Sequence, residues 1–139
     1  MNSYKDKTAL VTGASSGIGL AIANSLARRG AHLILTARST NKLNEVAKGI
    51  RDGGNRAHIF SGDLSQAGAA EQLYKEVLAA NLKVDLLVNN AGYGRWGDFT
   101  EFDRDDYAQM IQLNITTLTE LCHLFIPDMV SRGSGGIIN

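Results

Sequence analysis

The stretch Thr12–Gly19 places three glycines and two serines between an apolar run and an amphipathic segment. The apolar run, residues 8–11, predicts a strand, and Ile18, Ile22 and Leu26 fall on one face of a helix that follows it. A strand, a tight turn and a helix in this order direct backbone N–H groups and the positive end of the helix dipole to one point. The stretch therefore predicts a phosphate site, with an ordinary Gly/Ser turn as the alternative.

The spacing of the glycines differs from the general dinucleotide pattern G-x-G-x-x-G. Three residues separate Gly13 from Gly17, and Gly19 follows after one more. The phosphate prediction consequently depends on the strand, turn and helix context, and not on a match to that pattern. Glycine is needed at such a turn where a side chain would block the phosphate or the packing of helix on strand.

Apolar runs and helical patterns alternate along the rest of the chain. Strands are predicted at 8–11, 32–37, 57–60, 84–88 and 137–138, and helices over the apolar positions of 18–26, 43–50 and 70–78 and over about 105–127. This alternation is typical of an α/β fold with a doubly wound parallel sheet and right-handed crossovers. The loops that follow the first four strands then lie at one edge of the sheet, where ligands of such folds bind.

Composition favours one domain, residues 1–139, and excludes several functions. Fourteen Lys and Arg balance fourteen Asp and Glu, which argues against nucleic-acid or membrane-surface binding through bulk charge. No apolar run is long enough to span a membrane, and residues 1–6 lack the apolar core of a signal peptide. Cys122 is the only cysteine and no Cys/His cluster has metal-ligand spacing. We therefore expect a cytoplasmic protein without a metal site.

The end of the second predicted strand indicates which nucleotide binds. Dinucleotide folds that take NAD carry an acidic residue about 20 residues after the glycine turn, where it binds the ribose 2′-hydroxyl. This chain has Arg38 there and no carboxylate. A guanidinium is suited to a 2′-phosphate, so the residue predicts NADP(H) as the cofactor, unless Arg38 is only a solvated surface cation.

Five segments in order resemble the motifs of the short-chain dehydrogenase/reductase family: Thr12–Gly19, which is similar to its T-G-x-x-x-G-I-G turn, residues 62–64, Asn89–Gly92, Asn114, and the closing Gly136–Asn139. The resemblance covers nearly the whole chain. It implies a Rossmann-type fold, truncated here after the fifth strand, that transfers hydride between NADP(H) and a small-molecule carbonyl or alcohol substrate. It also implies a homo-oligomer, a dimer or tetramer. Residues 89–102 look most like those of 3-oxoacyl and broad-range ketone reductases.

The resemblance implies a set of cofactor contacts. They are Gly13, Ser15, Ser16, Gly17, Ile18 and Gly19 in the first turn, Arg38 after the second strand, Asp63 and Leu64 after the third, and Asn90, Ala91 and Gly92 after the fourth. In the family the Asp holds the exocyclic amine of adenine and the Leu covers the ring. Each segment has a plainer interpretation: Asp63 caps the following helix, and 89–92 is an ordinary turn.

Asn114 falls in the middle of an apolar row of the long helix, which predicts a buried amide with hydrogen-bond partners. The row is Tyr107, Ile111, Asn114, Leu118, Leu121, Phe125 and Met129. A structural asparagine bonded to nearby backbone satisfies that requirement. The family resemblance instead implies the catalytic Asn of an Asn–Ser–Tyr–Lys set, which holds a water in a proton relay.

The other members of that set are missing from these residues. None of the four tyrosines has a lysine four positions later, and the chain stops at Asn139, within the fifth predicted strand. We therefore expect the amino-terminal part of a reductase, incomplete at its carboxyl end and inactive by itself. The alternatives are a stand-alone nucleotide-binding module or pseudoenzyme, and a structural or interaction protein on an inherited fold.

Overall fold

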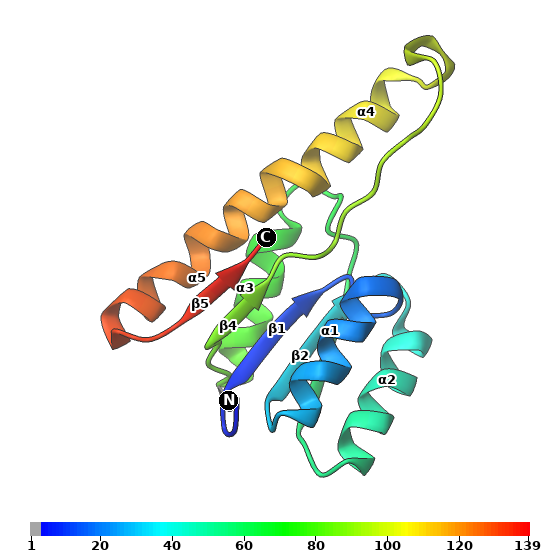
Figure 1. Cartoon of the computed structure of the whole chain (residues 1–139). Helices are drawn as coiled ribbons and strands as arrows, with labels where there is room; N and C mark the ends of the chain where they lie inside the picture. Colours follow the sequence, from blue (N-terminus) through cyan, green and yellow to red (C-terminus); the bar gives the residue numbers. More distant parts are fainter. Residues whose placement is uncertain (1–3) are drawn as a thin grey trace.

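The computed structural model describes residues 4–139, so residues 1–3 of the segment considered above for a signal peptide lie outside it. Its sheet has five strands in the order β3-β2-β1-β4-β5, and every adjacent pair is parallel (Figure 1). The strands are β1 Thr8–Thr12, β2 His32–Ala37, β3 Ala57–Ser61, β4 Leu86–Val88 and β5 Gly136–Ile138. The predicted doubly wound α/β fold is confirmed.

The strand order reverses between β1 and β4: β2 and β3 lie on one side of β1, and β4 and β5 lie on the other. Val11 of β1 is in register with Leu35 of β2 on one side and with Val88 of β4 on the other. The connections after β1 and β4 therefore diverge from adjacent strand ends. In open parallel sheets this is the point where ligands bind.

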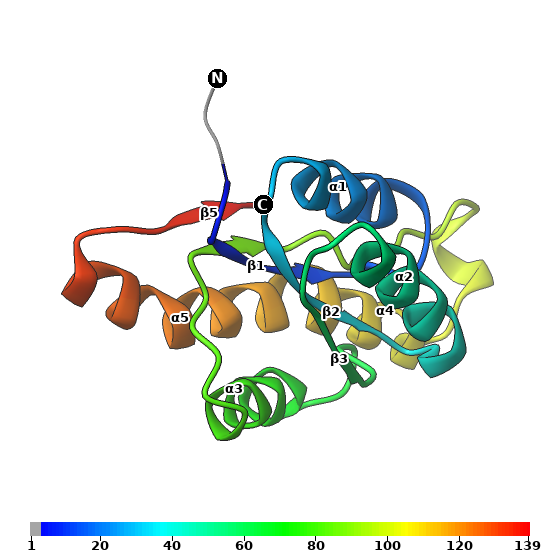
Figure 2. The same cartoon turned by 90° about the horizontal axis from the view of Figure 1, so that it is seen from below.

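Two helical layers cover the sheet. Helices α1, Gly17–Arg28, and α2, Thr40–Asp52, pack on one face, while α3, Ala69–Ala79, and α5, Leu118–Arg132, pack on the other (Figure 2). Strands buried on both faces are apolar throughout. Accordingly Leu33 and Leu35 belong to the core cluster under α1 and α2, and Ile34 belongs to the cluster under α3 and α5.

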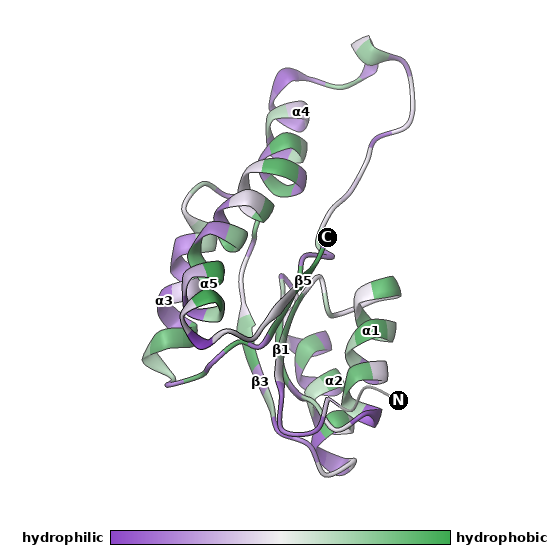
Figure 3. Cartoon of the chain, turned by 60° about the vertical axis from the view of Figure 1, so that its left-hand side comes forward, coloured by the Kyte–Doolittle hydropathy of each residue, from purple (hydrophilic) through white to green (hydrophobic). Residues whose placement is uncertain are grey.

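The predicted long helix is a continuous rod with three parts. The first is α4, Arg104–Ile111, which follows a single 3₁₀ turn, η1, at Phe99–Glu101. A π-helical segment, η2, then covers Gln112–Thr117 and leads into α5. Helix α4 projects past the edge of the sheet (Figure 1). Hydrophobic and hydrophilic stretches alternate along this rod (Figure 3).

The prediction of one buried row along this helix is wrong for its first half. Leu121, Phe125 and Met129 are buried, but Ile111 is 51% exposed and Asn114 is exposed as well. The cause is the projection of α4, because only the part of the rod that lies over the sheet has a core to face. Ile18, which begins the predicted apolar face of α1, is 73% exposed.

Smaller differences concern ends of elements. Ser39 is the N-cap of α2, since its hydroxyl accepts from the Lys42 N–H at 3.4 Å. Strand β4 begins at Leu86, two residues later than predicted. The backbone just before β4 is held by α5 instead, because the Arg132 guanidinium donates to the Val84 carbonyl at 2.7 Å.

Among residues 4–139 no helix has both the length and the apolar character that crossing a bilayer requires.

Candidate cofactor-binding site

The loops after β1, β2, β3 and β4 meet at one cleft of about 820 Å³ at the carboxyl ends of the strands. Its walls include most of the predicted cofactor residues, namely Gly13, Ser15, Ser16, Ile18, Arg38, Asp63, Leu64, Asn90, Ala91 and Gly92. Gly17 and Gly19 belong to the same turn without lining the cleft, and Asn114 does not line it either. The expected convergence of these loops on one edge is thus observed.

The turn from β1 into α1 uses glycine where the backbone is left-handed. Gly13 has φ +65° and Gly17 has φ +55°, a region that other residues rarely adopt. Ser16 is the N-cap of α1, and its side chain makes no capping hydrogen bond. The N–H groups of the first helical turn therefore remain available to an anion at the positive end of the helix dipole.

Gly19 has a different requirement, which is space. A Cβ built there would overlap the Gly13 carbonyl oxygen and the Asn90 side-chain nitrogen. A Cβ at Gly13 would lie 2.8 Å from the same Asn90 nitrogen. Both glycines thus allow the first turn to pack directly against the loop after β4.

Asn90 and Thr12 join these two loops. The Asn90 amide donates to the Thr12 carbonyl at 3.0 Å, and Thr12 Oγ1 accepts from the N–H groups of Asn90 and Ala91 at 3.0 and 2.9 Å. Thr12 is only 2% exposed. Sequence reasoning did not identify the role of Thr12, although a hydroxyl at the end of an apolar strand is a signal that it has a buried partner.

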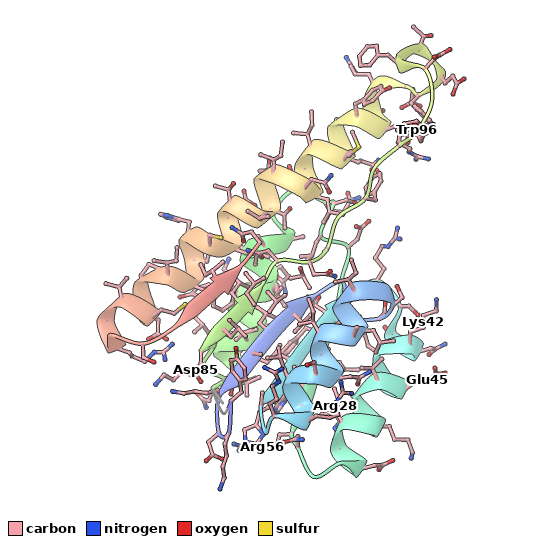
Figure 4. The ribbon with its side chains drawn as sticks, in the orientation of Figure 1. Arg28, Lys42, Glu45, Arg56, Asp85 and Trp96 are labelled. Atoms are coloured by element: carbon pink, nitrogen blue, oxygen red, sulfur yellow. The ribbon has the colours of Figure 1, made fainter. Side chains whose placement is uncertain are left out.

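Two cations also line the cleft, Arg38 after β2 and Lys42 in the first turn of α2. Both residues are exposed, and neither takes part in an ion pair within residues 4–139. In Figure 4, Lys42 lies at the upper end of α2, whereas Arg28 and Arg56 lie at the lower end of the molecule. Lys42 was not predicted as a cleft residue. Its place four residues after Arg38, in the first turn of a helix that starts at Thr40, could have indicated that it lies near Arg38.

Asp63 organises the turn after β3 and also lines the cleft. Its carboxylate accepts from the Ser65 hydroxyl at 2.7 Å and from the Ser65 N–H at 3.0 Å. The pKa of the Asp63 carboxyl is lowered, mainly by the hydrogen bond from the Ser65 hydroxyl. Burial opposes this shift, while the Ser65 N–H, Gln66 and the charge of Arg38 add to it. The interpretation of Asp63 as the cap of the following helix is wrong, because α3 begins at Ala69 with Gly68 as its N-cap. Asp63 instead stabilises the turn that precedes this helix and lines the cleft.

Asn114 is bonded to the loop after β4 through both polar atoms of its side chain. Its amide nitrogen donates to the Tyr93 carbonyl at 2.8 Å, and its oxygen accepts from the Tyr93 N–H at 3.1 Å. A Cβ at Gly92 would lie 2.9 Å from that oxygen. The amide is satisfied by backbone, as the structural alternative required, although it is exposed and not buried.

Beyond Gly92 the cleft continues between the loop after β4 and the helical rod of α4 and η2. Tyr93, Arg95, Gln109 and Leu113 line this end. The Arg95 guanidinium pairs with Asp106 at 2.7 Å and lies 5.4 Å from the centre of the Phe102 ring. No group of His, Cys, Asp and Glu side chains with a metal-binding arrangement occurs in the described part of the chain.

A parallel sheet with a glycine turn at its switch point and loops from four strands around one cleft defines a nucleotide-binding α/β protein of the Rossmann type. Residues 7–139 match the family model for short chain dehydrogenases, so the chain belongs to that family.

Individual relatives agree with this assignment. The chain is 43% identical over 137 residues to a fatty acyl-CoA reductase from Acinetobacter baylyi, covering 97% of this chain and 46% of the relative. Among solved structures, a metagenomic short-chain oxidoreductase in complex with NADP superposes with a TM-score of 0.91 at 38% identity, over 99% of this chain and 63% of that one. A 3-oxoacyl (acyl-carrier-protein) reductase from Agrobacterium tumefaciens with NADP bound has a TM-score of 0.89 at 35% identity, over 97% and 52%. The chain thus spans about half the length of the curated relatives it matches.

Proposed function

We propose that this chain binds NADP(H) and forms the cofactor-binding part of an oxidoreductase that transfers hydride between nicotinamide and a small-molecule carbonyl or alcohol. The observation that carries the proposal is the shared cleft, which both the glycine turn and Arg38 line. The two NADP-bound relatives described above support the same cofactor.

The residues around the cleft fit the parts of such a cofactor. Free N–H groups of the turn at 13–19 suit the diphosphate, and the Asp63–Leu64 turn offers a carboxylate and an apolar face to adenine. Arg38, with Lys42 beside it in the cleft wall, suits the 2′-phosphate. When bound, the nicotinamide ring supplies the hydride chemistry, and the protein supplies position and charge.

For Asn114 we propose the place in a proton relay that the family resemblance implies. Its side chain uses one N–H and one lone pair of its oxygen on the Tyr93 backbone. An asparagine side chain has a second N–H and a second lone pair, so Asn114 keeps the capacity to hold a water while it fixes the loop.

These 139 residues are expected to bind the cofactor but not to catalyse the reduction of a substrate. A tyrosine acts as an acid near neutral pH only when a neighbouring cation lowers its pKa of about 10. None of Tyr4, Tyr74, Tyr93 and Tyr107 has a lysine four positions later. We therefore propose that the chain by itself binds the cofactor without reducing a substrate.

The test is a calorimetric titration of NADPH and NADH into the chain. NADPH is expected to bind at least about tenfold tighter, because a charge-assisted phosphate contact contributes about 1.5–3 kcal/mol. Arg38→Asp should reverse the preference, and Arg56→Asp, an exposed arginine at the other end of the sheet, should leave it unchanged. Equal or tighter binding of NADH by the unmodified chain, or NADPH oxidation when a ketone is added, would contradict the proposal.

We also propose that the protein is a cytoplasmic homo-oligomer. Apolar side chains on the rod of α4, η2 and α5 remain exposed, among them Ile115 at 59% and Val130 at 71%. Exposed apolar residues grouped on one element are typical of an interaction surface. Light scattering that finds only monomer at micromolar concentration would contradict this part.

A further inference from the structure

The π-helical segment η2 contacts two of the loops that line the cleft. Asn114 bonds the Tyr93 backbone in the loop after β4. Thr117, at the end of the same segment, donates its hydroxyl to the Leu64 carbonyl in the loop after β3 at 2.7 Å. One short segment of helix therefore holds both loops.

The Thr117 bond is buried and its direction is fixed. Thr117 is 1% exposed, and its hydroxyl also accepts from the Gln112 side-chain amide at 3.2 Å. Gln112 and Thr117 are five residues apart, a separation that brings side chains together across a π turn and not across an α turn. The Leu64 carbonyl can only accept, so the hydroxyl proton is directed to it, and Gln112 occupies one of the two lone pairs of the hydroxyl oxygen.

The tethered carbonyl belongs to the part of the cleft assigned to adenine. Leu64 is 6% exposed and lines the cleft together with Asp63. The Asp63 carboxylate is bonded within its own turn, to Ser65 and Gln66. The contact to Thr117 is therefore an anchor of this turn on the rest of the molecule, in addition to the packing of the Leu64 side chain.

We propose that Thr117 is a positioning residue for nucleotide binding. Through Leu64 it sets where the adenine-side loop lies relative to the loop that Asn114 holds. The inference rests on the proposed function, because it takes the cleft to hold a dinucleotide that spans both loops.

The first experiment measures affinity. Thr117→Val keeps the shape of the side chain and removes the hydroxyl, and adenosine 2′,5′-bisphosphate and NADP⁺ are titrated into each variant. Both ligands are expected to bind about fivefold to tenfold more weakly, since one hydrogen bond is lost. Thr117→Ser should restore the affinity. Thr119→Val is the matched control, because within residues 4–139 the Thr119 hydroxyl bonds only to the Ile115 carbonyl of its own rod, at 2.8 Å.

The second experiment needs no ligand, so it separates this inference from the proposed function. Amide hydrogen exchange in residues 62–66 should become faster in Thr117→Val, while exchange in residues 13–19 stays as in the unmodified chain. If Thr117→Val does not fold, Gln112→Leu, which removes the group that orients the hydroxyl, should speed the same amides. Unchanged exchange in residues 62–66 would overturn the inference. Unmodified protein that binds neither ligand would instead refute the proposed function, while exchange would still decide whether Thr117 anchors the loop after β3.

Discussion

Gly19 illustrates how a single residue type is set by packing between two loops. Its missing side chain leaves room for the Gly13 carbonyl and for the Asn90 amide, which in turn holds the Thr12 carbonyl. Neither neighbour is free to move, because one is backbone and the other is bonded to backbone. The position therefore tolerates no Cβ, even though Gly19 lies in a helix, where alanine is otherwise the better residue.

We predict that Gly19→Ala lowers the unfolding free energy by about 1–3 kcal/mol, the usual cost of overpacking. It should also weaken NADPH binding, because the first turn is displaced from the loop after β4. Gly49→Ala is the matched control. Gly49 lies inside α2 with open space around its Cβ position, and the change there should stabilise by about 0.5–1 kcal/mol. Urea unfolding measures both, and equal stability of Gly19→Ala and the parent would contradict the packing argument.

At this scale the sequence predicted the residues of the cleft better than their contacts. Arg38 and the Gly13–Gly19 turn are recognisable because their residue types are unusual for a strand end and a helix start. The partners of Thr12 and Thr117 are not recognisable, since a hydroxyl in an apolar context indicates that a partner exists but does not identify it. Their importance comes from partners 53 to 79 residues away in the chain, which only the fold brings close.

The long helix shows what periodicity can and cannot predict at the scale of elements. The 3.6-residue pattern correctly indicated a helix past residue 105, and the structure carries it to Arg132. The pattern did not reveal the π-helical segment. A π-helix differs from an α-helix only in its i→i+5 hydrogen bonds, and no residue type marks that difference in the sequence. Nor could it show that α4 extends past the sheet, which depends on the length of the strands.

Arg132 fastens the far end of α5 to the sheet. Its guanidinium pairs with Asp85 at 2.8 Å and also donates to the Val84 carbonyl, and the Arg132 and Asp85 side chains are 16% and 14% exposed. Since removal leaves a mostly buried carboxylate without its cation, Arg132→Met should lower the unfolding free energy by about 2–3 kcal/mol.

The matched control for Arg132 is Arg104→Met. Its side chain is 96% exposed and it only approaches Asp105 at 3.9 Å, so the change should stay within about 0.5 kcal/mol. Denaturant melts of the two variants provide the comparison. If both lose the same stability, the contact with Asp85 does not fasten α5.

For the whole molecule, the doubly wound parallel sheet was predictable because apolar strands alternate with helices along the chain, and connections of this kind are right-handed. Parallel pairing then brings four loops to one edge without any further information. What the sequence left open was how tightly these loops are joined, and the answer lies in Thr12, Asn90, Asn114 and Thr117. Each of them makes a hydrogen bond from a side chain to the backbone of another loop or strand end.

The central claim is that these four loops form one site for a nucleotide with a 2′-phosphate. Amide hydrogen exchange of the chain with NADP⁺, with NAD⁺ and without ligand tests it most directly. We predict that NADP⁺ slows exchange in residues 13–19, 38–42, 62–65 and 90–93 together, and that the excess over NAD⁺ is confined to 38–42. Protection that misses any of these loops, or that is the same at 38–42 for both nucleotides, would contradict the account.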